Sequence, residues 1–222
     1  MGMNQPVAFA CLLLALSLLP SDGSAEDERN PLSPDGRWRY EVVDSQFPEI
    51  HQTSTNQSAL DLTANDRSVP HAAAAEVVWS PDSKRFAFNY SPPTASHSTY
   101  VTTAFYQLRG EEWVLLPSPI DEDSTKKSFA ALAKHLPKGE RPPRLWRADP
   151  NRLVFKVRSW TDADTAILYV YTAGTSSGGG DSPSAFLFTL KFDPEGKCKI
   201  TSAQKIAQKS IEDYAWPMIQ AR

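Results

Sequence analysis

Hydrophobic and polar residues alternate along most of this chain, which is the pattern of half-buried β-strands. In Trp38–Val43 large hydrophobic residues alternate with charged ones, and in Arg85–Tyr90 every second residue is aromatic. The same alternation predicts further strands over residues 58–63, 76–79, 100–108, 112–116, 153–157, 166–171, 185–192 and 197–202. The sequence therefore predicts a mostly β protein of antiparallel hairpins.

One segment departs from this alternation. From Phe129 to Leu136, hydrophobic residues fall at positions i, i+3, i+4 and i+7, and Pro137 follows directly. This spacing predicts one amphipathic helix at about 125–136, inserted between sheet units. A looser pattern of the same kind predicts a short C-terminal helix within residues 203–216.

A short phrase recurs immediately before several predicted strands. It reads Leu-Ser-Pro-Asp-Gly-Arg-Trp at 32–38, Trp-Ser-Pro-Asp-Ser-Lys-Arg at 79–85 and, in a degenerate form, Trp-Arg-Ala-Asp-Pro-Asn-Arg at 146–152. Proline fixes φ at the second position of a turn, and Asp followed by Gly or Ser suits the next two. We therefore interpret Asp35 and Asp82 as turn residues rather than as members of a site.

The phrase and the strand that follows it resemble the TolB-type β-propeller repeat, which also occurs in the propellers of prolyl oligopeptidase-like enzymes. The resemblance covers residues 32–43 and 76–90 and, more weakly, 146–158. It implies propeller-like sheet units, and the four strands predicted between 76 and 116 match one blade in size. Propellers of this family usually close with six or seven blades, whereas this chain holds about three units. We expect one β-rich domain over 26–222 that is an open stack, a small propeller-like module or a half that pairs with another chain.

The first 25 residues have the features of a secretory signal peptide. An uncharged apolar run, Val7–Leu19, precedes Pro20 and a stretch of small residues, which predicts cleavage after Ala25. The run is shorter than the roughly 20 apolar residues that span a bilayer. We therefore expect export to the periplasm or the cell exterior. Cys198 would then be the only cysteine, and we expect a buried or half-buried free thiol.

The overall composition excludes some classes of partner. The chain is 41% hydrophobic and 22% charged, with a net charge of −3, as in ordinary globular proteins. Such a balance argues against a nucleic-acid partner or an anionic membrane surface. No further apolar span follows the first 25 residues, so no membrane span is expected in the mature chain.

Possible catalytic motifs do not assemble into a complete set. The stretch Gly174–Gly178 matches a nucleophile elbow, but a strand follows instead of a helix and no histidine lies beyond His135. Asp121–Asp123 and Asp162–Asp164 could offer oxygens to calcium, yet each lacks the rest of a binding loop. The histidines have no metal-ligand spacing; they are His51, His71, His97 and His135. The sequence thus assigns no catalytic, cofactor-binding or metal-ligating residue.

Tryptophans are the remaining candidates for ligand contact. Five lie on or beside strands, where packing between sheets is the default and a carbohydrate or peptide surface is the alternative: Trp38, Trp79, Trp113, Trp146 and Trp160. The sequence favours an exported, non-catalytic domain that binds a protein or an envelope ligand. The alternatives are a secreted or envelope hydrolase with its site on the long loops, and a structural partner that completes its sheet with another chain.

Overall fold

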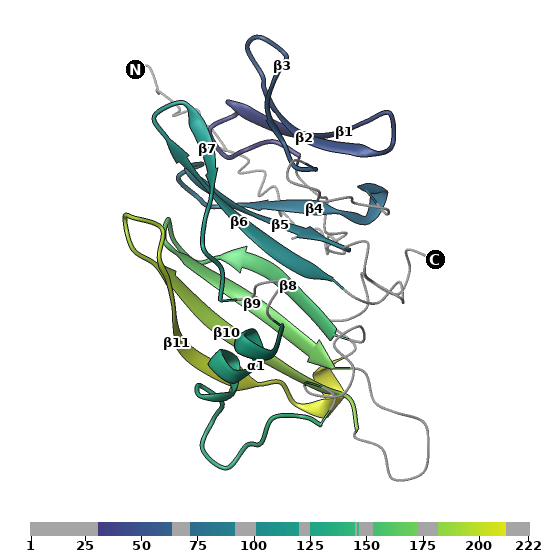
Figure 1. Cartoon of the computed structure of the whole chain (residues 1–222), viewed down its shortest axis with the longest axis vertical. Coiled ribbons are helices and arrows are strands. Elements are labelled where there is room, and N and C mark those ends of the chain that lie inside the picture. Colours follow the sequence, from purple (N-terminus) through teal and green to yellow (C-terminus); the bar gives the residue numbers. More distant parts are fainter. Residues whose placement is uncertain are drawn as a thin grey trace, which may run out of the picture.

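The computed structural model describes residues 31–63, 72–91, 101–119, 125–144, 146, 153–172 and 182–211. In these residues eleven strands form three antiparallel sheets, which follow one another along the long axis of the molecule (Figure 1). Sheet A has the order β1 (Trp38–Val43), β2 (Phe47–Gln52), β3 (Gln57–Asp61). Sheet B has the order β4 (Glu76–Trp79), β5 (Arg85–Tyr90), β6 (Thr102–Arg109), β7 (Glu112–Leu115). Sheet C has the order β11 (Cys198–Lys205), β10 (Ser184–Phe192), β9 (Thr165–Thr172), β8 (Leu153–Trp160).

The predicted architecture is confirmed at this level: the fold is mostly β, with three sheet units and one inserted helix, α1 (Thr125–Ala133). The sheets do not close into a propeller. Two short 3-10 turns complete the described elements, η1 (Ala72–Ala74) and η4 (Gln208–Ser210).

Two local predictions need correction. Strand β2 was not predicted, because Pro48 interrupts its alternation, yet it is the central strand of sheet A. Residues 203–205, expected in a C-terminal helix, belong to β11; a bulge opposite Thr189 and Leu190 lets β11 continue its pairing up to Phe186. Residues 212–216 of that predicted helix lie outside the described residues, as do residues 1–25 with the predicted signal peptide.

Sheet B is covered on both faces, and the alternation along β5 explains how. All six residues of β5 are buried. Phe86 and Phe88 lie in one hydrophobic cluster with Trp38 of sheet A, whereas Ala87 lies in another with sheet C. Because both faces of β5 are buried, a polar side chain such as Asn89 is tolerated there only if it forms hydrogen bonds.

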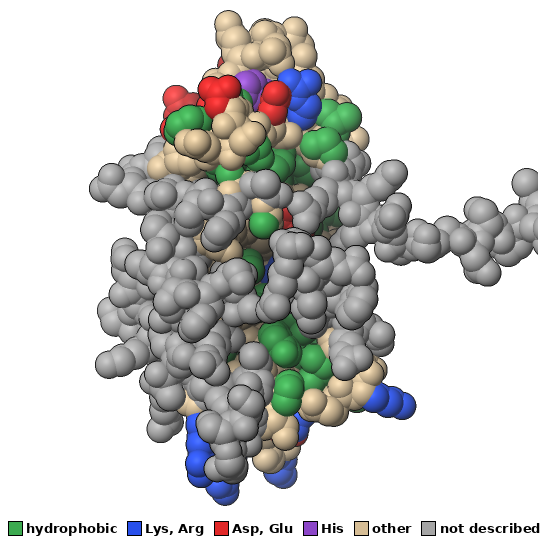
Figure 2. Space-filling model, turned by 90° about the vertical axis from the view of Figure 1, so that its right-hand side faces the viewer, with side chains coloured by type: hydrophobic (Ala, Val, Ile, Leu, Met, Phe, Trp, Pro, Cys, Tyr) green, Lys and Arg blue, Asp and Glu red, His purple; other side chains and the backbone are tan. Residues whose placement is uncertain are grey.

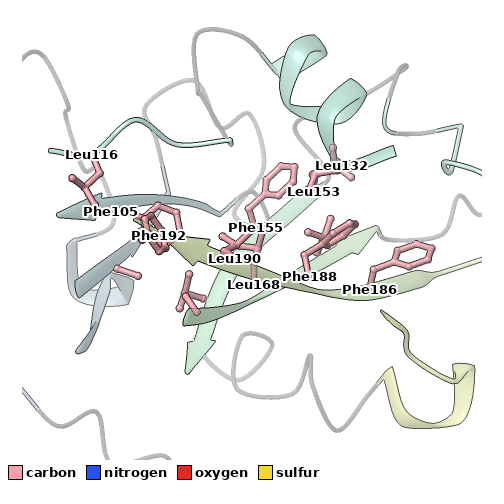
Figure 3. Close-up of a cluster of buried hydrophobic side chains, with 14 of the residues drawn as sticks. Phe105, Leu116, Leu132, Leu153, Phe155, Leu168, Phe186, Phe188, Leu190 and Phe192 are labelled. Carbon is pink, nitrogen blue, oxygen red and sulfur yellow. The ribbon is translucent and has the colours of Figure 1, made fainter. Parts of the chain in front are cut away.

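Sheet B covers part of the inner face of sheet C, and α1 and Trp146 cover another part. Phe105 packs on Phe192 with 5.0 Å between ring centroids, whereas Phe129 of α1 packs on Phe155 at 5.7 Å. Leu132, fully buried, extends from α1 towards the same strands (Figure 3). The helix therefore contributes Phe129 and Leu132 to the hydrophobic core on this face.

The other face of sheet C contacts the chain that follows β11. Ile206 and Ile211 are buried there in a cluster with Val154, Tyr169 and Ala185. The segment 206–211 thus returns across the sheet from which it came.

The recurring phrase forms two turns with the same internal hydrogen bonds. In the first, Ser33 Oγ donates to Asp35 at 2.7 Å and accepts from the Trp38 N–H at 3.0 Å. In the second, Ser80 Oγ donates to Asp82 at 2.7 Å and accepts from the Arg85 N–H at 2.9 Å. The Ser and Asp of the phrase therefore stabilise the turn, and the interpretation as turn residues is confirmed.

The two turns also contact each other. The N–H of Asp35 donates to Ser83 Oγ at 3.0 Å. Ser83 has φ +59°, the left-handed conformation that Gly36 adopts in the first copy with φ +71°. A serine at this unfavourable position supplies the hydroxyl that links sheet A to sheet B.

Candidate functional site

A group of buried polar side chains lies between sheets B and C, where a catalytic cluster could be suspected. Asn89 and Thr103 are 2% and 3% exposed, and Lys156 forms an ion pair with Glu76 at 2.9 Å. Asn89 Nδ2 donates to both Glu76 Oε1 and the Val157 carbonyl, each at 2.9 Å. These side chains are engaged with one another and with the backbone, so we assign them a structural role.

The backbone contacts show what this cluster stabilises. Strand β8 is the edge of sheet C, and an unpaired edge carries free N–H and C=O groups. Val157 N–H donates to Asn89 Oδ1 at 3.0 Å, and Thr103 Oγ1 donates to the Phe155 carbonyl at 3.0 Å. Val101 pairs with the start of the strand, its carbonyl accepting from Phe155 N–H at 2.8 Å. Side chains of sheet B therefore take the place of a neighbouring strand.

A second link between sheets B and C lies at two turns of sheet C, the one between β8 and β9 and the one between β10 and β11. Arg85, 7% exposed, donates to the carbonyls of Ala163 at 2.9 Å and Asp193 at 3.2 Å. Gly196 of the turn between β10 and β11 has φ +83°, and a Cβ there would lie 2.3 Å from Leu116 Cδ2. Only glycine allows this close approach, so the turn serves docking between sheets.

The outer face of sheet A carries charged side chains at the end of the stack (Figure 2). Arg39 Nη2 lies 2.7 Å from Glu41, and His51 Nε2 lies 3.0 Å from Glu49. Each pair joins two residues that are two positions apart on one strand, β1 or β2, and solvent-accessible ion pairs of this kind contribute little to stability. A polar outer face is what a terminal unit of a stack needs to remain solvated.

A cleft of about 160 Å³ opens beside this face, where sheet A meets the turn between β6 and β7. Its walls come from the start of β1, the end of β2, the start of β3 and the turn before β7. The lining residues are Arg37, Trp38, Gln52, Gln57, Ser58, Ala59 and Glu111.

The cleft has charged groups of both signs. The guanidinium of Arg37 lies 5.5 Å from the centre of the Trp38 ring. No ion pair forms at Arg37 or Glu111 with any part of the chain that the structure describes. Both side chains are exposed and remain able to bind a ligand.

The backbone around the cleft is fixed by hydrogen bonds. Thr53, in the turn after β2, donates through its N–H to the Arg37 carbonyl at 3.0 Å and through Oγ1 to the Gly36 carbonyl at 2.7 Å. Thr55 Oγ1 donates to Gln52 Oε1 at 3.2 Å. Trp38, 3% exposed, packs edge-on against Trp113 at 5.4 Å. Arg37 and Gln52 therefore extend from anchored positions.

Neighbouring groups lower the pKa of Asp35, which lies in the turn beside the cleft. Partial burial acts to raise the pKa of Asp35, but hydrogen bonds from Ser33, the Arg37 N–H and Ser83 outweigh burial, and the Arg37 charge adds to them. The pKa of Asp35 is consequently below its usual value.

Most of the candidates weighed from sequence are not brought together. His51 lies on β2, and His135 is exposed just after α1. Asp164 N–H donates to Asp162 Oδ1 at 2.9 Å in an exposed turn. The ranges 121–123 and 174–178, with His71 and His97, lie outside the described residues. Within the described ranges, no three His, Cys, Asp or Glu side chains gather as a metal site would require.

The tryptophans pack within and between sheets, as expected. Trp146 Nε1 donates to Thr172 at 2.9 Å and Trp160 Nε1 to the Val78 carbonyl at 2.9 Å. Trp79 and Trp113, together with Trp38, lie between sheets A and B with indole nitrogens that find no acceptor among the described residues.

Sequence reasoning missed the cleft. Its residues are of common polar types, separated by up to 74 positions between Arg37 and Glu111, and no spacing rule relates them. The one available signal was the polar stretch that follows the unrecognised strand β2, because Gln52 and Gln57 flank a tight turn.

The comparisons with known proteins leave the assignment to the structure. No protein-family model and no curated protein matches this chain. In the described part of the chain, no helix has the length and apolar character needed to cross a bilayer.

Proposed function

We propose that this protein is an exported, non-catalytic binding domain built from TolB-type repeats, and that the cleft of sheet A contacts its ligand. The observation that carries the proposal is that Arg37 and Glu111, neither of which forms an ion pair within the described chain, both line a cleft with amide and hydroxyl groups. Groups of this kind recognise a polar ligand through hydrogen bonds and charge.

The other sets of polar side chains are engaged in contacts within the protein, which supports the cleft as the binding site. The buried cluster at Asn89 holds the edge of β8, and Arg85 holds a turn of sheet C. The charged side chains on the outer face of sheet A pair with one another. Among these sets, the cleft is the one whose charged groups form no ion pair within the described chain. Export is supported by the composition of residues 1–25.

The proposal is tested by nuclear magnetic resonance of the ¹⁵N-labelled protein with a panel of small sugars, amino acids and dipeptides. A binding domain predicts saturable shifts confined to the amides of residues 37–38, 52, 57–59 and 111, with the compound recovered unchanged. Conversion of a compound would favour an enzyme, and the absence of any saturable shift at the cleft would overturn the proposal.

A further inference from the structure

The cleft also indicates the chemical class of its ligand, an inference that rests on the function proposed above. We infer that it binds a single saccharide unit through neighbouring hydroxyl groups. Four features of the cleft carry this inference: its size, its balance of charge, its hydrogen-bonding groups and its rigidity.

The size of the cleft limits the ligand to about one ring. Ligand pockets for drug-sized molecules measure roughly 300–1,000 Å³. A cavity of about 150 Å³ is enough for a benzene ring. At about 160 Å³ the cleft can hold one six-membered ring, with the rest of a longer glycan outside.

The charges in the cleft favour a neutral ligand. Arg37 would attract an anion, but Glu111 of the same lining would repel it, and the reverse holds for a cation. Both groups are exposed, so water screens each of them and neither holds a lone ion strongly.

The hydrogen-bonding groups match adjacent hydroxyls. The amides of Gln52 and Gln57 and the hydroxyl of Ser58 can each donate and accept, as a sugar hydroxyl does. Arg37 adds a planar fork of donors and Glu111 a pair of acceptors, and such planar groups can contact two neighbouring hydroxyls at once. A free amino acid could engage both charges, but the lining offers Ala59 and the largely buried Trp38 as its only apolar residues.

The rigidity of the walls reduces the entropy lost on binding. Thr53 fixes the backbone at Arg37, and Thr55 orients the Gln52 side chain by bonding its oxygen. The amide nitrogen of Gln52 is thereby left as the donor for a ligand hydroxyl. A shallow, solvated site with few fixed groups is expected to bind with a Kd of about 1 mM.

The test titrates the ¹⁵N-labelled protein with glucose, galactose and N-acetylglucosamine in one arm and with glycine and alanyl-alanine in the other. We expect a sugar, and neither of the two zwitterions, to give saturable shifts at the cleft. Gln57→Ala and Glu111→Ala should weaken sugar binding at least tenfold. Gln204→Ala and Glu195→Ala, exposed outside the cleft, are the matched controls and should leave it unchanged.

Glu111→Gln separates the two ligand classes. The amide retains an acceptor, so sugar binding should fall only a few fold, whereas a zwitterion would lose its counter-charge and its binding. If a zwitterion binds at the cleft and the sugars do not, the saccharide inference is wrong and the proposed binding function stands. If no probe in either arm shifts the cleft residues, both fall.

Discussion

Replacing Asn89 by alanine tests whether this side chain of sheet B holds the edge strand β8 of sheet C. Its carboxamide exchanges two hydrogen bonds with the backbone of Val157, as a neighbouring strand would do. It also bonds Glu76 and Thr103. Asn89→Ala removes all of these contacts and leaves the edge of β8 without partners at its middle.

The expected loss of stability follows from the groups left behind. Val157 is fully buried, so neither its N–H nor its C=O can turn to water. Each buried polar group without a partner costs roughly 1–3 kcal/mol, which gives about 4 kcal/mol for the two. Native domains of ordinary size are stable by only about 5–15 kcal/mol, so the effect is large.

Urea unfolding, followed by far-ultraviolet circular dichroism and tryptophan fluorescence, measures this loss. With a slope of about 2 kcal/mol per molar urea, the midpoint should fall by about 2 M without a change of slope. Gln204→Ala, at an exposed position of β11, is the control and should unfold like the wild type. An Asn89→Ala variant within about 1 kcal/mol of the wild type would refute the bridging role.

Asn89→Asp gives an independent check by pH. The carboxylate would face the Glu76 carboxylate and the Val157 carbonyl, which now accept from Asn89 Nδ2. Burial and like charge would raise its folded pKa above its unfolded value, so the variant should lose stability as pH rises. We expect the deficit relative to wild type to be larger at pH 7.5 than at pH 5; a pH-independent deficit would contradict the assigned contacts.

The other predictions concern single groups. Trp160→Phe should cost about 1 kcal/mol more than Trp113→Phe in the same unfolding assay, because the Trp160 indole donates to the Val78 carbonyl whereas the Trp113 indole has no acceptor among the described residues; equal costs would show that this bond contributes nothing. Burial raises the pKa of Cys198 to about 12, so the folded protein should react with iodoacetamide at pH 8 far more slowly than the urea-unfolded chain, as followed by mass spectrometry; equal rates would contradict the burial. The pKa of Asp35 is below its usual value, so its charged form adds stability at neutral pH that is lost as pH falls through the folded pKa. Asp35→Asn should therefore lower Tm at pH 7, and the difference should narrow below about pH 3.8; a constant difference would contradict this.

The strands were largely predictable because their signal is local. Alternation gave the bounds of β1, β4 and β5 as the structure has them, since each side chain's direction is set by its position in the strand. The inserted helix was predictable for the same reason, although α1 ends at Ala133 rather than near 136. Strand β2 was not, because Pro48 near its start is a residue that sequence rules place outside central strands.

The contacts between sheets and the cleft could not be predicted, because they depend on register between distant segments. Asn89 meets Val157 across 68 residues, and in the sequence it stands only as one polar position of an aromatic strand. Arg37 and Glu111 are equally ordinary until sheet A is stacked on sheet B. Such positions are defined by packing, which no single-sequence period records.

The last residue of the repeated phrase, Trp38 in the first copy and Arg85 in the second, connects the turn to a neighbouring sheet. In both copies this residue begins a strand and reaches the next sheet along the chain: Trp38 packs against sheet B, and Arg85 bonds carbonyls of sheet C. The residue before it is Arg37 in the first copy and Lys84 in the second, both exposed. The cleft lies at the first copy, where residues of the sheet A hairpin and Glu111 line it together with Arg37. The turn is therefore structural in both places, and the end of the stack is what makes its arginine available to a ligand.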